Sequence, residues 1–326
     1  MCENDGATTR SLGLPVSGPP IGMFSLFRLP LGAFSPHDLL YVFEDDGRLA
    51  GLLRVERESR TDEWTIVELD AIGQAEAGDI RFRLVQHLLR DGSKRGAVRF
   101  HVACADADGN VELFMQAGFA RYGDEIVLSR AASEDLPAPW SDEQAQAARI
   151  RPAVGLDALA LSRLYSTATP QPVQRLEAVR LPDWERQGTN WRVPRSSLAP
   201  ILRFADVEAY VQESADGGRD GTHLDAFLQV GVAKEDQPHY LKIMARPGTD
   251  VGDLVSFALG VIAARTAREG VARRQDHGVI APVRTYEHPI DRALEDEGFR
   301  PISTVTLLMK ETLVRVAEPA LVPAVR

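Results

Sequence analysis

The strongest constraint on the fold is a phrase that occurs twice. The segment Glu112–Leu128 reads ELFMQAGFARYGDEIVL, and the segment Arg292–Leu308 reads RALEDEGFRPISTVTLL. In each copy an apolar helical segment stops at Gly-Phe, and an apolar strand ending in leucine follows at the same distance. Glycine suits the left-handed residue that ends a helix, and the next large apolar side chain folds back over the last turn. We therefore expect Phe119 and Phe299 to be core residues of two related units.

The residues before the first Gly-Phe extend the pattern to a whole unit. Leu39–Arg57 contains two apolar runs around an Asp-Asp-Gly turn, which predicts a hairpin. Trp64–Ile72 reads as a third strand. Gly78-Asp79 opens a helix with one apolar face, and Val98–Ala105 returns as a buried strand. A helix between two such strands predicts a right-handed crossover joining a parallel pair.

The second half repeats this order. Ala205–Gln212 and Ala226–Ala233 form a predicted hairpin, and His239–Ala245 is the third strand. Gly252-Asp253 opens the next helix, and Val279–Val283 is the strand that follows it. Hairpins supply antiparallel neighbours and crossovers supply parallel ones, so each unit is an α/β unit with a mixed sheet.

These elements divide the chain into five segments. We assign residues 1–20 to a flexible N-terminus, 21–132 to the first unit, 133–148 to a linker or short exposed helix, 149–315 to the second unit, and 316–326 to a tail. The second unit opens with a strand at Ile150 and a leucine-rich helix. The first unit has only a Gly- and Pro-rich lead, so it reads as N-terminally shortened.

Composition excludes several classes of function. A net charge of -10 argues against nucleic acid and anionic membranes as partners. Cys2 and Cys104 are too few and too far apart for a disulfide framework, and no histidine pair has the spacing of a zinc site. The sequence contains no signal peptide pattern and no long apolar run, so we expect a cytoplasmic protein without a membrane span and without a bound metal.

The order of elements resembles the GNAT superfamily of N-acetyltransferases. The resemblance is carried by IRPAVGLDALALSRLY at the start of the second unit and by the phrases LFMQAGF and ALEDEGF. It implies two tandem GNAT-like units and an acyl-CoA-dependent transfer of an acetyl group to a small-molecule or protein amine. The alternative is two generic α/β units that share similar helix ends.

The resemblance also implies that acetyl-CoA binds at the N-terminus of the glycine-opened helix. In the second unit this places Arg246, Gly248, Val251 and Gly252 at the cofactor, within ARPGTDVGDLVS. Free backbone N–H groups and the helix dipole can hold a pyrophosphate there.

The first unit has the sequence AIGQAEAGDIRF at the equivalent place, where Gln74 and Gly78 are the candidates. Both helices carry an acid in the first turn, Asp79 and Asp253, which competes for the same N–H groups. Self-capped helices that bind nothing remain the alternative for both loops, and the second loop is the better candidate.

Two residues are candidates for catalysis. The family often places a tyrosine acid four residues before the closing glycine, but Phe114 and Leu294 stand there, so a tyrosine elsewhere or bulk water would have to serve. Tyr286, just after the fifth strand of the second unit, is a candidate acid by proximity. Glu68, beside Asp70 and close to the strand that carries His101, is the candidate base. The alternatives are a packing tyrosine and ordinary surface carboxylates.

The leading hypothesis is thus an acyl-CoA-dependent N-acyltransferase in which the second unit is the catalyst. The alternative is a non-catalytic binding or scaffold protein that keeps the fold without its cofactor loop.

Overall fold

The computed structural model describes most of the chain between the two termini. The described residues are residue 12, 38–57, 62–71, 77–107, 109–132, 134–187, 191, 193, 197–199, 202, 204–215, 223–233, 237–268 and 278–312. Gln74, the expected tail at 316–326 and all of the expected flexible N-terminus except Leu12 lie outside these residues. So does nearly all of the chain before residue 38, and the shortening of the first unit stays a prediction. Leu12 is buried, and its carbonyl accepts from the N–H of Ala105 at 2.7 Å.

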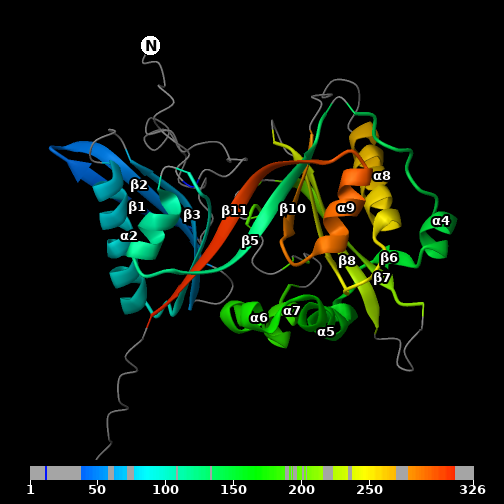
Figure 1. The fold of residues 1–326 in the computed structure, drawn as a ribbon, viewed down its shortest axis with the longest axis horizontal. Coiled ribbons are helices and arrows are strands. Elements are labelled where there is room, and N and C mark those ends of the chain that lie inside the picture. The colour runs from blue at the N-terminus through cyan, green and yellow to red at the C-terminus, as the bar shows by residue number, and fades with distance from the viewer. Residues whose placement is uncertain are drawn as a thin grey trace, which may run out of the picture.

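The described part of the first half contains five strands and two helices in the expected order (Figure 1). They are β1 (Asp38–Asp45), β2 (Arg48–Arg57), β3 (Glu63–Ala71), α2 (Ala77–Lys94), β4 (Arg99–Ala105), α3 (Asn110–Gln116) and β5 (Ala120–Arg130). The hairpin turn between β1 and β2 has positive φ at both central residues, Asp46 and Gly47, as a type I′ turn requires.

The second half repeats these elements after a short exposed helix, α4 (Asp142–Ala147), which begins with a Ser141 capping box. Its elements are β6 (Ile150–Pro152), α5 (Ala158–Ala168), α6 (Gln171–Glu177), α7 (Leu181–Glu185), β7 (Phe204–Glu213), β8 (Leu224–Ala233), β9 (His239–Ala245), α8 (Gly252–Arg268), β10 (Val279–Arg284), α9 (His288–Asp296) and β11 (Arg300–Glu311).

The eleven strands of the described residues form one mixed sheet in which the halves exchange their closing strands. The order is β1-β2-β3-β4-β11-β5-β10-β9-β8-β7-β6. β11, the last strand of the second half, lies between β4 and β5 of the first half, and β5 in turn pairs with β10. Figure 1 shows β11 and β5 crossing the middle of the molecule side by side. The predicted α/β class is confirmed. The predicted boundary between the two units, at residues 133–148, stays a prediction.

The two Gly-Phe phrases have the same geometry. Gly118 and Gly298 have φ values of 86° and 89°. Phe119 N–H donates to the carbonyl of Phe114, and Phe299 N–H donates to that of Leu294, each at 3.0 Å. This is the hydrogen bond of a Schellman motif, and the phenylalanines are 4% and 0% exposed. The expectation that both are core residues is confirmed.

Helices cover the sheet in two layers. α2 and α3 pack on one half of the sheet, and α8 and α9 pack on the other half. α5 and α7 pack on the opposite face of β8 and β9, where they build a separate core with Trp184 and Trp191. Figure 1 places α5, α6 and α7 together below the sheet. Among the helices of the described ranges, none combines the length and the apolar character needed to cross a bilayer.

Both predicted parallel strand pairs are present, but in the second half the two strands pair over a shorter length. β3 and β4 pair from Glu63 to Ile66, whereas β9 and β10 pair only at two positions, His239 with Val279 and Tyr240 with Ile280. Beyond Tyr240 each strand keeps its antiparallel neighbour on the other side. The two strands therefore separate beyond this point, and we call the region between them the opening between β9 and β10.

Candidate functional site

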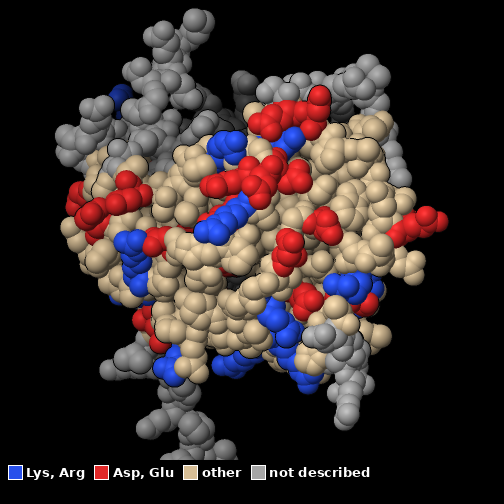
Figure 2. All heavy atoms as spheres, turned by 45° about the vertical axis from the view of Figure 1, so that its right-hand side comes forward, with Lys and Arg blue, Asp and Glu red and all other residues tan. Residues whose placement is uncertain are grey.

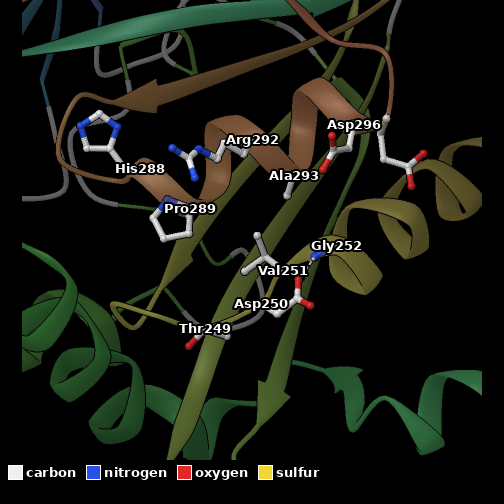
Figure 3. A pocket seen from close by; sticks show the side chains of 10 residues that line it. Thr249, Asp250, Val251, Gly252, His288, Pro289, Arg292, Ala293 and Asp296 are labelled. Atoms are coloured by element: carbon white, nitrogen blue, oxygen red, sulfur yellow. Dashed lines mark hydrogen bonds between the residues drawn. The ribbon is translucent and has the colours of Figure 1, made fainter.

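A pocket of about 450 Å³ lies between the N-terminus of α8 and one side of α9. One wall is the loop that leads into α8, from Thr249 to Gly252, and the other is one side of α9 from His288 to Asp296. Figure 3 shows the two walls facing each other. The lining residues are Thr249, Asp250, Val251, Gly252, His288, Pro289, Arg292, Ala293, Asp296 and Glu297.

The loop into α8 is ordered by its own backbone and one carboxylate. Val251 is buried, and its carbonyl accepts the first helical hydrogen bond, from Val255 N–H at 3.0 Å. Asp250 Oδ1 accepts from Gly252 N–H at 3.0 Å, and Figure 3 shows Asp250 turned toward Gly252. The carboxylate that caps this helix is therefore that of Asp250. Asp253, which the sequence singled out, is exposed in the first turn.

The charge of the pocket is mainly acidic. Three carboxylates, Asp250, Asp296 and Glu297, line it together with one guanidinium, that of Arg292. Figure 2 shows the wider surface on this side, where acidic side chains gather and basic ones lie among them without forming a broad basic area. Any anionic ligand of this pocket must rely on Arg292 and the positive end of α8.

The predicted cofactor residues of the second loop divide into two groups. Val251 and Gly252 line the pocket, and Gly252 begins α8 as expected. Arg246 and Gly248 do not line it. The Arg246 guanidinium donates from Nη2 to the carbonyl of Leu224 at 3.2 Å, which ties it to the start of β8. Gly248 has a φ of 85°, so it serves the turn between β9 and α8.

The equivalent place in the first half is bridged by a polar pair. Arg81, in the first turns of α2, donates from Nη1 to Oδ1 of Asn110 at the start of α3, at 2.9 Å. When Gly78 is aligned with Gly252, Val255 takes the position of Arg81, and when the two Gly-Phe pairs are aligned, Ile290 takes the position of Asn110. Both residues are apolar and buried. Gly78 is exposed in the first turn of α2. In the first half, α2 and α3 would form the two walls of an equivalent pocket, and Arg81 bridges them. The second half is therefore the better place for a ligand.

A buried lysine spans the opening between β9 and β10. Lys242 Nζ donates to the carbonyl of Pro282 and to Oε2 of Glu287, both at 3.0 Å. The lysine is buried at 1% exposure. Its neighbours Leu241 and Ile243 belong to the core under α8, so Lys242 lies on the opposite face, toward α5 and α7.

A network of buried charges continues from this lysine. Glu287 Oε2 also accepts from the backbone N–H of Arg284, whose guanidinium contacts Glu125 and Glu177. Tyr165 donates to Glu177 at 2.5 Å. Burial raises the pKa of Glu177 above its ordinary value, while the nearby Arg284 opposes this rise.

Tyr286, the predicted acid, belongs to the same network. Its hydroxyl accepts from Arg284 Nη1 at 3.1 Å, and the ring is partly buried. Burial raises the pKa of Tyr286 well above its ordinary value. This shift makes the hydroxyl a weaker acid than an ordinary tyrosine, so only its position in the network supports the predicted role.

Glu68, the predicted base, lies in the other half. It accepts from Arg54 Nε at 3.1 Å, and burial raises its pKa, with Arg54 opposing and Asp70 adding to the rise. The strand of His101 is its neighbour, as expected. Because β4, β11 and β5 lie between β3 and β10, Glu68 and Tyr286 are not brought into one site. Phe114 and Leu294 are buried core residues.

Several residues of the candidate site were not found by sequence reasoning. Arg292 and Asp296 come from α9, where the pattern indicated only a helix end. Lys242 did leave a signal, because it is a single charge inside the apolar strand HYLKIMA. A lysine is almost never fully buried unless it is paired, so this position pointed to a buried acid. Within the described ranges, no group of three or more His, Cys, Asp and Glu side chains is placed to hold a metal ion.

Comparison with solved structures identifies the architecture. A tandem GNAT protein from the clavulanic acid biosynthesis pathway, solved without AcCoA, matches with a TM-score of 0.54 at 16% identity, over 94% of this chain and 92% of that one. A GCN5-related N-acetyltransferase from Sphaerobacter thermophilus matches with a TM-score of 0.46 at 17% identity, over 82% and 78% of the two chains. No protein-family model and no curated protein matches the sequence. The chain has a tandem GNAT fold, which confirms the predicted resemblance at the level of the fold.

Proposed function

We propose that this protein is an acyl-CoA-dependent N-acyltransferase whose second half holds the acyl-CoA. The observation that carries the proposal is the pocket at the N-terminus of α8, beside the point where β9 and β10 separate. The pocket lies beside α8 and α9, at the end of the sheet where the two strands separate. In this proposal a ligand bound in the pocket has one end at the separated strands.

The pocket is large enough for a pyrophosphate, but its carboxylates oppose the binding of an anion. The first N–H groups of α8 have no partner inside the helix, and the positive end of the dipole favours an anion. Arg292 would supply a cation from α9. Asp250 competes for the N–H of Gly252, but its side chain is exposed and can turn away. When bound, acyl-CoA supplies an activated thioester.

The proposed catalytic residues are assigned to different halves. Tyr286 is the proposed acid of the second half, because its hydroxyl carries a proton at neutral pH and Arg284 fixes its position. Glu68 remains a candidate base for a reaction in the first half only. The proposed acceptor is an amine, and we place the protein in the cytoplasm as part of the same proposal.

The alternative is a non-catalytic protein of GNAT fold. Two observations favour it: the acidic lining of the pocket and the Lys242 side chain that spans the opening. Such a protein would bind CoA weakly or not at all and would transfer no acyl group.

Isothermal titration calorimetry with CoA separates these functions. We expect binding to the wild type and loss of binding in Ala293→Trp, because a large side chain at this lining position fills the pocket. Circular dichroism melting shows whether the variant folds. If the wild type binds no CoA, or if folded Ala293→Trp binds as the wild type does, the proposal for this pocket fails.

A further inference from the structure

The pocket at the N-terminus of α8, which we call the α8 pocket, has its charged residues sorted along one side of α9. His288, Arg292 and Asp296 all line it and are spaced four residues apart, so they form one row on the helix. Glu297 continues the lining just beyond the last residue of α9. Figure 3 shows His288 and Arg292 at one end of this wall and Asp296 at the other. The pocket therefore has a basic end and an acidic end.

The two charged residues in the middle of this row are available to a ligand. Side chains four residues apart on a helix are close enough to form an ion pair. Within the described part of the chain, however, the side chains of Arg292 and Asp296 have neither an ion-pair partner nor a hydrogen-bond partner. Both residues are exposed. The guanidinium and the carboxylate can therefore each act on a bound molecule.

The dipole of α9 strengthens the same polarity. Its positive end lies at the basic end of the pocket and its negative end at the acidic end. Two arginines near the acidic end are held by backbone groups. Arg130 Nε donates to the carbonyl of Glu297 at 2.9 Å, and Arg300 Nη1 donates to that of Glu295 at 3.1 Å. Neither arginine lines the pocket, so the acidic end has no cation of its own among the described lining residues.

This polarity distinguishes between the phosphates of CoA. The pyrophosphate next to the pantetheine arm is favoured by Arg292 and by the free N–H groups at the start of α8. The separate phosphomonoester on the 3′ oxygen of the ribose adds about two further negative charges at neutral pH. For these charges the described lining offers no second cation, and its remaining charged groups are carboxylates. The 3′-phosphate therefore experiences net repulsion.

We propose that the α8 pocket selects an acyl donor whose only phosphates are those next to its pantetheine arm, as in acyl-dephospho-CoA. The inference rests on the proposed function and deepens it. Asp296 is the specificity-determining residue, because its carboxylate opposes the 3′-phosphate. Arg292 binds the phosphates that both donors share. CoA itself still binds, but less tightly than its dephosphorylated form.

Calorimetric titration of the wild type with dephospho-CoA and with CoA tests the selection, since the two ligands differ only in the 3′-phosphate. At about 0.01 M salt, where screening is weak, we expect dephospho-CoA to bind about two- to fivefold more tightly. At about 0.15 M salt the ratio should fall below about twofold, because exposed charges are then screened beyond roughly 8 Å. If CoA binds at least as tightly as dephospho-CoA at low salt, the inference is wrong.

Two variants of matched charge test the role of Asp296. Asp296→Asn removes a carboxylate from the lining at nearly constant size, so the affinity for CoA should rise about two- to threefold and that for dephospho-CoA should rise less. Glu295→Gln removes the same charge from an exposed position of α9 that does not line the pocket, and it should leave the ratio of the two affinities unchanged. An unchanged ratio in Asp296→Asn, or the same change in both variants, would overturn the assignment. Circular dichroism melting confirms that both variants fold.

Arg292→Gln separates the shared phosphates from the 3′-phosphate. It should weaken the binding of both ligands by about fivefold and keep their ratio, because it removes one charged contact to the pyrophosphate. If only CoA binding is weakened, Arg292 contacts the 3′-phosphate and the inference is wrong. The proposed function fails separately: in that case the wild type binds neither ligand, whereas tighter binding of CoA rejects only the donor selection.

Discussion

Arg284 and Glu125 lie directly opposite each other on β10 and β5, and Arg284 Nε donates to Oε1 of Glu125 at 3.2 Å. The two strands come from different halves of the chain. Both side chains are buried, and Glu125 also accepts from Ser197 Oγ. The exchanged strands are thus joined by a buried ion pair as well as by backbone hydrogen bonds.

Removing this arginine should strongly destabilise the protein. In Arg284→Met, Glu125 and Glu177 lose their shared cation inside the protein, and we expect a loss of about 3–5 kcal/mol in urea denaturation. The control is Arg186→Met, since Arg186 is largely exposed and its pair with Asp183 contributes about 1 kcal/mol or less. Equal losses in both variants would show that the buried pair makes no special contribution.

Truncation of the phenylalanines after the two helix ends tests the duplicated core. Phe119→Ala and Phe299→Ala should each lower the free energy of unfolding by about 3–5 kcal/mol, because each ring is buried. Met115, on α3, is 55% exposed, and Met115→Ala should change it by less than about 1 kcal/mol. A small effect at either phenylalanine, measured by denaturant titration, would contradict its role as a core residue.

Two glycines of α2 should respond to alanine in opposite directions. A Cβ at Gly92 would lie 2.6 Å from the ring of Phe100 and 3.0 Å from that of Trp64, so Gly92→Ala should destabilise by about 1–3 kcal/mol. A Cβ at Gly78 meets nothing within 4 Å. Gly78→Ala should stabilise by about 0.4–1 kcal/mol, since alanine restricts the unfolded chain. Thermal and chemical denaturation measure both, and destabilisation by Gly78→Ala would contradict the open geometry.

The buried thiol of Cys104 should be protected from reagents. Burial raises its pKa from 9.0 to about 12. Thiol labelling at pH 8, in a Cys2→Ser background, should therefore be negligible in native protein and rapid in urea. Fast labelling of the native protein would show that this strand opens.

The same thiol gives a pH dependence. Above about pH 9 the unfolded chain loses a proton that the folded protein retains, so raising the pH through this range favours unfolding. The free energy of unfolding of the wild type should fall, relative to Cys104→Ala, between about pH 9 and 12. A constant difference between the two proteins would contradict the raised pKa.

Asp250 should limit the affinity of the α8 pocket for CoA. Asp250→Asn keeps an oxygen that accepts from Gly252 N–H and removes the negative charge, so CoA affinity should rise about two- to fivefold. Asp253→Asn should have the smaller effect, because Asp253 does not line the pocket. Calorimetry of both variants measures this. A larger effect at Asp253 would place the phosphate elsewhere on the helix.

The fold was largely accessible from sequence because its signals are local. The helix ends at Gly118 and Gly298, the hairpin turn at Gly47 and the alternating strands each depend on neighbouring residues. The exchange of β5 and β11 depends on pairing across the chain, and both strands would suit either arrangement by their composition. The order of strands in space could not be obtained from these patterns.

The candidate pocket was only partly visible in the sequence. Val251 and Gly252, which were expected at the cofactor, line it, because a glycine-opened helix is a local pattern. Arg246 was expected at the cofactor, yet its guanidinium donates a hydrogen bond to the nearby carbonyl of Leu224. Lys242 and Glu287 meet only after the chain has folded, so their pairing carried no signal beyond the isolated charge in an apolar strand.

The place of β11 affects the synthesis of this protein on the ribosome. β11 ends at Glu311, yet it fills the position between β4 and β5, which are made much earlier. Until β11 emerges, β4 and β5 each have an open edge in the middle of the nascent sheet, and open edges pair readily with other chains. The first half therefore cannot complete its sheet before β11 has been made, and its open edges need protection from aggregation until then.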